Sequence, residues 1–343
     1  MRHISRAWQK PQGTLIVGPM KNYCTGLLLP GERKSVEPMA ARLAGNHVRR
    51  MHQSLHHVVA DAPWNDEAVL DRCLDFVLPA LLRRDPVVVW VVDDTGFPKK
   101  GRESVGVARQ YCGQVGKQDN CRVAVSLSVT TEKASMPVAY RLYLPDSWIQ
   151  DRKRRKKTGM PESIQFQTKP EIALDQIRRA RERSIPQGVV LGWRQGVKQK
   201  LQSRFAALRV RPAHRDYWQA EPHPEEWLLI EWPTGESEPT KYWRSTLPAD
   251  TPLVELVHMA KHRWIIERDY QELKQELGLG HYEGRGWRGF HHHATLCIAA
   301  YGFLVAEPSR FSPSAQVGNL GLPTPESPPD FRPRGSPRSS RAA

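Results

Sequence analysis

The chain has 343 residues, enough for two domains or for one large domain with an insertion, and 39% of them are hydrophobic. Its 51 Lys and Arg exceed its 36 Asp and Glu by 15, which suits a polyanionic partner such as nucleic acid. A generally basic surface or a basic tail would give the same excess. The five scattered cysteines form no Cys-x-x-Cys pair, which argues against zinc and for reduced, buried thiols. No apolar run approaches the roughly 18 residues of a membrane helix, and the N-terminus lacks the apolar segment of a signal peptide.

Residues 1–84 are predicted to form a small helical region. Apolar side chains recur at helical spacing from about residue 37 to residue 57, so one helix is expected there. A second apolar stripe begins after Trp64, where Asn65 or Asp66 is the predicted N-cap. Residues 1–20 show no clear period, and no element is assigned to them.

A buried sheet is predicted next. Residues 87–92 (VVVWVV) are a continuous β-branched run, typical of a strand that is buried on both faces in an α/β sheet. Asp93, Asp94, Thr95 and Gly96 follow it directly. Residues 121–130 and 138–144 are read as two more strands, so three consecutive antiparallel strands are expected.

The pattern changes several times after this sheet. Residues 150–170 are read as a very basic loop. Helices are expected at residues 171–183, from Pro252 to about Leu277, and at residues 290–306, and strands at residues 189–191, 227–231 and 241–246. From Pro308 onward the chain is rich in Pro, Ser, Gly and Arg and is predicted to be a disordered basic tail.

Two carboxylates are candidate metal ligands. Asp94 follows the buried strand, and a carboxylate at a strand's end is a good ligand because the sheet holds it rigidly. Asp-Thr-Gly also commonly just turns the chain, so that alternative stays open. On the long helix, Glu267 lies between Arg263 and Lys274 at spacings of four and seven, which puts all three on one face. Either this is an ordinary ion-pair stripe, or Glu267 binds metal while the two basic side chains hold DNA phosphates.

Two further clusters have alternative readings. The basic run at residues 152–157 is either a solvated loop or a DNA contact. The side chains of His291, His292 and His293 would point all round a helix start. We therefore expect these histidines to pack or to contact phosphates rather than to bind a metal.

Two long blocks of the sequence are specific enough to compare with known families. The first comprises residues 93–101 (DDTGFPKKG), 104–113 (SVGVARQYCG) and 116–121, and the second comprises residues 263–274 and 278–285 (GLGHYEGR). Together they resemble the DDE transposases of insertion-sequence family 701, and the resemblance covers about residues 37–307. The wider group around insertion-sequence family 4 carries a Tyr-Arg-Glu-Lys signature. Its last three positions match Arg263, Glu267 and Lys274, but its tyrosine position falls on Ala260.

The resemblance implies an α/β fold with an RNase H-like core at residues 85–307, a β-rich insertion at about residues 192–250, a DNA-binding helical region at residues 1–84 and a tail at residues 308–343. It implies two Asp and one Glu that hold two Mg²⁺ ions, with Mn²⁺ as an alternative, for DNA cleavage and strand transfer. Asp94 corresponds to the first Asp and Glu267 to the Glu. Asp93 fits less well, because the family pattern is an Asp followed by Thr. The implied DNA contacts are Arg263, Lys274, Lys99, Lys100, Arg152, Lys153, Arg154, Arg155, Lys156 and Lys157.

The second Asp of this triad is missing. Family members carry it just after a buried strand that follows a helix, which here is near Gly192. The chain continues Trp-Arg-Gln-Gly196 at that point, so the simplest inference is an internal deletion between about Leu191 and Trp193 that also shortened the β-rich insertion. With fewer carboxylates to offset the repulsion between two metals, we expect weak Mg²⁺ binding and impaired catalysis.

Three alternatives follow for the function. The chain is an impaired insertion-sequence transposase that acts on double-stranded DNA, or an inactive DNA-binding remnant that regulates an intact copy, or a misfolded product. Partners would be the insertion-sequence ends and target DNA, with a homodimer or pairing with a full-length copy. We expect no membrane association and a place in the bacterial cytoplasm beside the nucleoid.

Overall fold

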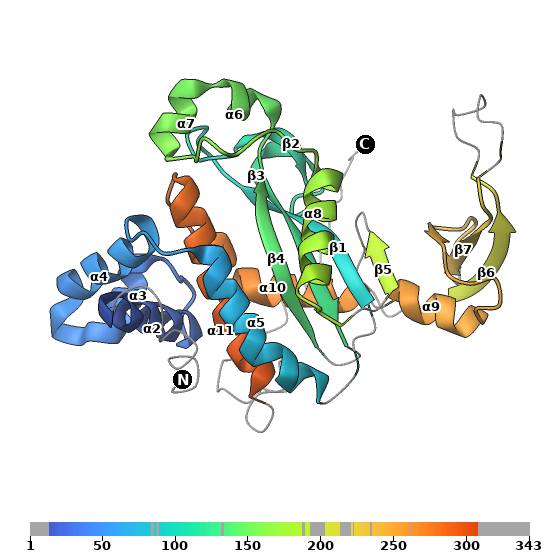
Figure 1. The fold of residues 1–343 in the computed structure, drawn as a ribbon, viewed down its shortest axis with the longest axis horizontal. Helices are drawn as coiled ribbons and strands as arrows, with labels where there is room; N and C mark the ends of the chain where they lie inside the picture. The colour runs from blue at the N-terminus through green and yellow to red at the C-terminus, as the bar shows by residue number, and fades with distance from the viewer. Residues whose placement is uncertain are drawn as a thin grey trace, which may run out of the picture.

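The computed structural model describes residues 14–83, 86, 89–131, 134–186, 189–192, 203–212, 221, 223–233, 235–261 and 263–307. They form a mixed α/β molecule, as predicted, in which helices flank a five-stranded sheet and a three-stranded sheet lies to one side (Figure 1). Within these ranges every helix is too short or too polar to span a lipid bilayer. The predicted tail at residues 308–343 lies outside the described residues.

The larger sheet is built on β1 (Val89–Pro98) and β3 (Lys117–Thr130), which pair antiparallel along the whole of β1. β4 (Ser135–Tyr143) pairs antiparallel with β3, so the three predicted antiparallel strands are confirmed. β2 (Ala108–Cys112), which was not predicted, forms a short hairpin with the start of β3. On the other side of β1, β5 (Val189–Gly192) pairs parallel to it.

β1 is longer than the apolar run predicted. Val89, Trp90 and Val91 are buried, and the Trp90 indole donates to the Pro186 carbonyl oxygen at 2.7 Å. The strand then continues to Pro98, because Thr95, Gly96 and Phe97 are also buried in the sheet. The expectation that Asp94 follows the end of the strand is therefore wrong, since it lies inside the strand.

The N-terminal part is helical, as predicted, but its helices differ from the expected ones. The single helix expected at residues 37–57 is divided into α3 (Val36–Ala44) and α4 (Val48–Ala60), because Gly45 adopts φ 46° and a 3₁₀ turn, η1 (Gly45–His47), follows. α2 (Thr14–Leu28) was not predicted. α5 (Asp66–Leu82) begins as expected, with the Asn65 side chain accepting from the Ala68 N–H at 2.9 Å.

The segment read as a basic loop is partly helical. It contains α6 (Asp146–Gln150) and α7 (Arg152–Thr158), so the loop prediction is wrong for the basic run itself. Asp151 caps the start of α7 by accepting from the Arg154 N–H, and Gly159 ends it in a left-handed conformation. α8 (Lys169–Glu182) matches the expected helix and begins with a capping box made by Thr168 and Glu171.

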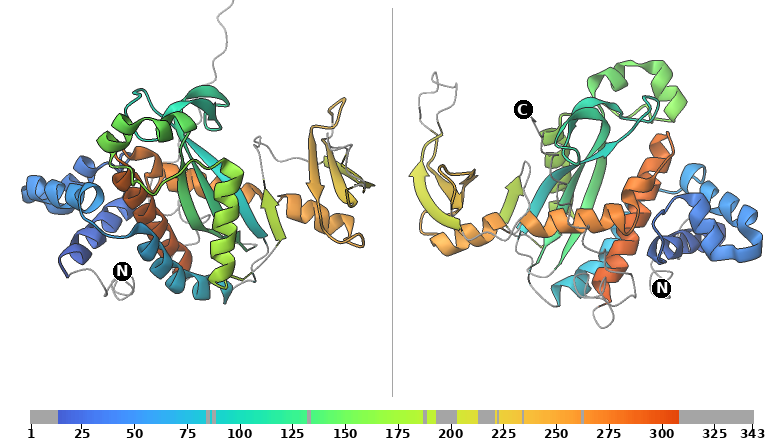
Figure 2. Two further views of the ribbon diagram at one scale, coloured as in Figure 1. Left: turned by 45° about the horizontal axis from the view of Figure 1, so that its top comes forward. Right: turned by 180° about the vertical axis from the view of Figure 1, so that it is seen from behind.

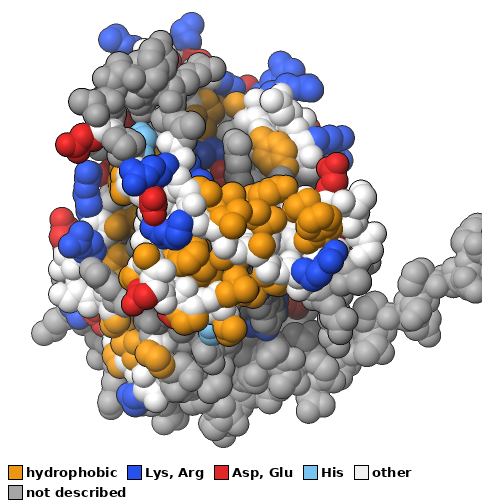
Figure 3. Space-filling model, turned by 90° about the vertical axis from the view of Figure 1, so that its right-hand side faces the viewer, with side chains coloured by type: hydrophobic (Ala, Val, Ile, Leu, Met, Phe, Trp, Pro, Cys, Tyr) orange, Lys and Arg blue, Asp and Glu red, His pale blue; other side chains and the backbone are white. Residues whose placement is uncertain are grey.

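The segment predicted to be a β-rich insertion contains a separate three-stranded sheet. It consists of β6 (Ser203–Val210), which was not predicted, β7 (Glu226–Pro233) and β8 (Lys241–Ser245), all antiparallel. Apolar side chains of this sheet remain exposed, including Leu208, Trp232 and Tyr242. Figure 3 looks at the molecule from this side and shows hydrophobic side chains gathered on the near face.

The long C-terminal helix of the prediction is observed as α9 (Leu253–Lys261) and α10 (Arg263–Gln275), followed by Gly278 at φ 68° and a 3₁₀ turn, η2 (Leu279–His281). α11 (Trp287–Ala306) is almost entirely buried and packs on α5, α2 and β4. α8 covers one face of the larger sheet and α10 crosses the other (Figures 1 and 2). All five cysteines are free and buried, which confirms the prediction that they are core residues.

Candidate active site

Asp94 lies in the middle of β1, directly opposite Val125 of β3. Val125 packs against Ile172 and Ala173 of α8, so this face of β1 is turned toward α8. The Lys169 ammonium, at the first residue of α8, contacts Asp94 Oδ2 at 2.6 Å. Both side chains are partly exposed, 43% for Asp94 and 34% for Lys169. The predicted metal ligand therefore has a protein cation as its neighbour.

Lys169 is a site residue that the sequence reasoning missed. Its Nζ also lies 5.5 Å from the centre of the Tyr143 ring, so two elements hold the ammonium beside the carboxylate. The capping box at Thr168 fixes the start of α8 and with it the position of the lysine. The readable signal was a lysine placed directly after a helix cap, although nothing in the sequence links it to Asp94.

Asp93 points away from Asp94, because successive side chains of a strand alternate between its two faces. Its charge acts on two side chains of α10. Burial raises the pKa of Tyr270, and Asp93 raises it further. Burial lowers the pKa of Lys274, while Cys112, Asp93 and Asp94 oppose this shift in that order. Asp93 is thus the carboxylate of the pair that acts more strongly on the α10 side of the sheet.

Glu267 is exposed on α10, two turns before Lys274. The helix confirms the predicted spacing between these two residues. α10 begins at Arg263, whose side chain lies outside the described residues. Asp94 therefore lies on the α8 face of the sheet, whereas Glu267 is on a helix that crosses the other face. Across the described ranges, no three His, Cys, Asp or Glu side chains are grouped closely enough to hold a metal ion.

The expected place of the second Asp is next to β1. The parallel register pairs Val89 with Val189 and Val92 with Gly192, so β5 ends two residues short of the level of Asp94. Gly192 is paired with Val92 in the register of the two strands, and Val92 lies on the same face as Asp94. A carboxylate at Gly192 would lie on the Asp94 face, two residues short of the level of Asp94, and the sequence has none there.

Two lysines predicted to contact DNA make hydrogen bonds within the protein. Lys99 donates to the Tyr282 carbonyl oxygen at 2.7 Å, and burial together with Arg122 lowers the pKa of Lys99 to about 8. Lys274 donates to the Gly96 carbonyl oxygen at 3.0 Å and lies over the Phe97 ring. In this arrangement both ammonium groups tie distant segments together. Lys100 is exposed.

The basic run on α7 divides into two sets. Arg154, Arg155 and Lys157 are bound locally, by the Arg102 carbonyl, by the Pro161 and Glu162 carbonyls, and by Glu103. Arg152, Lys153 and Lys156 are exposed. This second set is exposed and could meet a polyanion.

The three consecutive histidines are buried in α11 and pack, which was one of the two predicted roles. His292 stacks on Trp64 at 3.6 Å between ring centres. His293 accepts from the Tyr23 hydroxyl at 2.8 Å and donates through Nε2 to the Gly278 carbonyl at 2.9 Å. His291 donates through Nδ1 to the Trp287 carbonyl. Burial lowers the pKa of His292 and of His293 to about 4, so both stay neutral near pH 7.

A family model described as DDE superfamily endonuclease matches residues 15–192, which span α2 to the end of β5. The chain belongs to this family. It is also 32% identical over 139 residues to the "Probable transposase for insertion sequence element IS701" of Microchaete diplosiphon, an alignment that covers 40% of this chain. The chain spans 33% of that relative's length. Both findings confirm the resemblance to DDE transposases of insertion-sequence family 701 that the two sequence blocks indicated.

Proposed function

We propose that this DDE-family chain derives from an insertion-sequence transposase and that its carboxylate triad is incomplete, so DNA cleavage and strand transfer are impaired. The observation that carries the proposal is the pairing of β5 with β1. It brings the end of β5 to the level of Val92, one residue before Asp93, and residues 192–215 of the sequence contain no carboxylate. An internal deletion after Leu191 accounts for this loss.

The strand order supports an RNase H-like core at residues 85–307. Three antiparallel strands, β4, β3 and β1, are followed by β5 parallel to β1, with helices on both faces. In such a core the carboxylates come from the central strand, from its parallel neighbour and from a helix that crosses the sheet. Asp94 and Glu267 occupy the first and the last of these places, and Asp93 is the alternative for the first.

The donor set does not fit two Mg²⁺ ions. Two divalent cations at one site need several carboxylate oxygens, because those oxygens must offset the repulsion between the metals. Here Asp94 faces the Lys169 ammonium, and Glu267 is on an element that crosses the other face. We therefore derive no metal-dependent step for this chain and propose that it binds Mg²⁺ or Mn²⁺ weakly.

The proposal can be tested by restoring the missing group. Gly192→Asp adds a carboxylate to the strand beside β1, at the level of Val92, and Gly192→Asn adds nearly the same volume without the charge. Nicking of a supercoiled plasmid that carries the insertion-sequence ends is measured with Mg²⁺. We expect only background nicking by the wild type and by Gly192→Asn, and at least about tenfold more by Gly192→Asp, which corresponds to about 1.4 kcal/mol of barrier. Efficient Mg²⁺-dependent nicking by the wild type would contradict the impairment.

A second candidate function is DNA binding without catalysis. Its specific support is the exposed set on α7, Arg152, Lys153 and Lys156, in a chain with a net charge of +15. Such a remnant, with its helical region at residues 1–84 and its tail, would occupy insertion-sequence ends alone, as a homodimer, or paired with an intact copy. Binding of labelled duplex DNA across a salt series tests it, and an affinity that does not change with salt would exclude it.

A further inference from the structure

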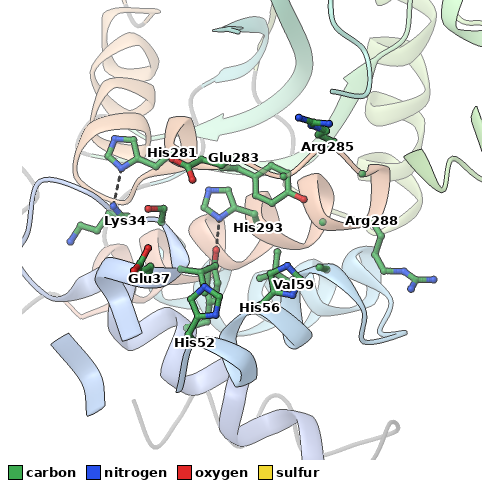
Figure 4. A pocket seen from close by; sticks show the side chains of 18 of the residues that line it. Lys34, Glu37, His52, His56, Val59, His281, Glu283, Arg285, Arg288 and His293 are labelled. Carbon is green, nitrogen blue, oxygen red and sulfur yellow. Dashed lines mark hydrogen bonds between the residues drawn. The ribbon is translucent and has the colours of Figure 1, made fainter. Parts of the chain in front are cut away.

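A cavity of about 700 Å³ separates the N-terminal helices from the segment that leads into α11. One wall is made by residues of α3, α4 and the loop before them, and the other by residues 281–286, 288, 289 and 293 (Figure 4). Thr158 and Gly159, at the end of α7, complete the lining. Its volume lies within the range of about 300–1,000 Å³ that ligand pockets in proteins occupy.

The charges around this cavity favour an anion. Its lining includes four cationic side chains, Arg33, Lys34, Arg285 and Arg288, and two carboxylates, Glu37 and Glu283. Arg33 pairs with Glu283, and the Lys34 ammonium donates to the Leu29 carbonyl. Arg285 and Arg288 are both exposed, and Arg288 donates to the backbone carbonyl of Asp61 at 3.0 Å. Their positive charge is therefore available to a ligand.

Uncharged hydrogen-bond donors also line the cavity. His281 Nδ1 accepts from the Lys34 N–H at 3.0 Å, so its hydrogen is on Nε2. Gly286 is the N-cap of α11, and no side chain caps this helix end. Because Gly286, Arg288 and Gly289 line the cavity, the first turn of a 20-residue helix, where backbone N–H groups have no partner within the helix, lies at its wall.

The wall with these donors is held rigidly. Tyr282 stacks on His293 at 5.4 Å, and its hydroxyl lies where side chains at Gly284 and Gly289 would be. Lys99 and Arg122 both donate to the Tyr282 carbonyl oxygen, at 2.7 and 3.1 Å. The two glycines therefore keep the wall close-packed, and the two cations fix its position before any ligand arrives.

We propose that this cavity receives phosphate groups of a DNA backbone, held by Arg285, Arg288 and His281. The exposed basic residues of α7 continue the same surface, since the end of α7 lines the cavity. The inference rests on the proposed DNA-related function and names the cavity as a place where DNA binds. The backbone would lie between the N-terminal helices and the core, so DNA would hold these two parts together.

The experiment compares two double variants of the full chain. Arg285→Gln with Arg288→Gln removes the two available charges, and Arg178→Gln with Arg181→Gln removes two exposed arginines of α8, outside the cavity. Binding of a short labelled DNA duplex is measured by fluorescence anisotropy across a salt series, and thermal melts check that each variant is folded. In a separate arm, inorganic phosphate alone is added and the melting temperature is recorded.

For the cavity variant we expect at least tenfold weaker DNA binding and a slope of log K against log salt that is smaller by about 2, since each phosphate contact contributes about 0.9. The α8 variant should bind within about twofold of the wild type, because its arginines lie away from the cavity. Equal binding by the two variants would overturn the inference alone. A wild type that binds no DNA would overturn the proposed function as well. Stabilisation by inorganic phosphate that only the cavity variant loses, with DNA binding unchanged, would assign the cavity to a free phosphate instead.

Discussion

At the scale of single residues, the neighbouring carboxylates Asp93 and Asp94 have different surroundings. Asp94 shares the α8 face with Lys169, whereas Asp93 acts on Tyr270 and Lys274 of α10. The sequence pattern favours Asp94 as the metal ligand, and the strand geometry turns Asp93 toward the helix that carries Glu267. Two adjacent Asp residues in a strand cannot serve the same face, so only one of them can join Glu267.

Lys169 is expected to compete with metal for Asp94. Replacing it by Gln frees the carboxylate, and the affinity for Mn²⁺ should rise severalfold. The free energy of unfolding should change by less than about 1 kcal/mol, because the pair is partly exposed. Titration with Mn²⁺ by electron paramagnetic resonance and urea denaturation measure the two effects. Lys169→Arg keeps the charge and serves as the control, and unchanged Mn²⁺ binding in Lys169→Gln would refute the competition.

Gly289 is expected to be intolerant of any side chain, because the Tyr282 hydroxyl occupies the place of a Cβ. Gly289→Ala should lower the free energy of unfolding by about 1–3 kcal/mol through overpacking. In a Tyr282→Phe background the same change should cost less, because the clashing oxygen is gone. Urea denaturation of the wild type, the two single variants and the double variant measures this difference as a double-mutant cycle. Gly101→Ala is the matched control, since nothing lies within 4 Å of a Cβ there, and equal costs at the two glycines would contradict this packing.

At the scale of elements, β1, β3, β4 and β5 of the larger sheet were predictable, whereas β2 and the position of the site were not. The β-branched run around Trp90 identified β1, and Asn65 identified the start of α5. α7 was missed because its seven residues are almost all basic, although Asp151 and Gly159 were readable cap signals. α2 was missed because its apolar residues show no clear period and Pro19 lies inside it.

The site depends on contacts that local patterns do not encode. Lys99 is within a basic, glycine-rich segment that looks exposed, but it is half-buried because Tyr282, 183 residues away, offers it a carbonyl. The ion pair of Lys169 with Asp94 likewise joins positions 75 residues apart. Spacing within α10 was predictable from helix geometry, since Glu267 and Lys274 belong to one continuous helix.

The acidic side of α10 should make stability depend on pH. Burial, and then Asp269, raises the pKa of Glu272 from 4.5 to about 7. The folded state thus holds a proton that the unfolded state has lost, so Glu272 costs stability as the pH rises from 4.5 through 7, and costs nothing below 4.5. Glu272→Gln should stabilise the protein by about 1–2 kcal/mol near pH 8, after discounting for partial exposure. Urea denaturation across pH measures this, and a stability gain that persists at low pH would point to another cause.

At the scale of the whole molecule, α11 joins the N-terminal helices to the core. The Tyr23 hydroxyl of α2 donates to His293, and Trp64 stacks on His292. α11 also packs along β4 of the larger sheet. These contacts bury residues from both ends of the described chain in one hydrophobic core.

This shared core predicts cooperative unfolding. Tyr23→Phe leaves the buried Nδ1 of His293 unpaired and should cost about 1–3 kcal/mol. Circular dichroism and tryptophan fluorescence should report one coincident transition for the wild type and for the variant. Tyr111→Phe, at a tyrosine that is 41% exposed, should have almost no effect. Separate transitions for helices and sheet would show that the two parts are independent.

The five buried thiols can report how fast different parts of the protein open. Cys24 and Cys73 belong to α2 and α5, Cys112 and Cys121 to the β2–β3 hairpin, and Cys297 to α11. While the protein is folded, an alkylating reagent reaches a sulfur only when the chain around it opens. Peptide mass spectrometry gives the order in which the five sulfurs are alkylated. This order ranks the opening rates of α2, α5, the β2–β3 hairpin and α11 without any engineered label.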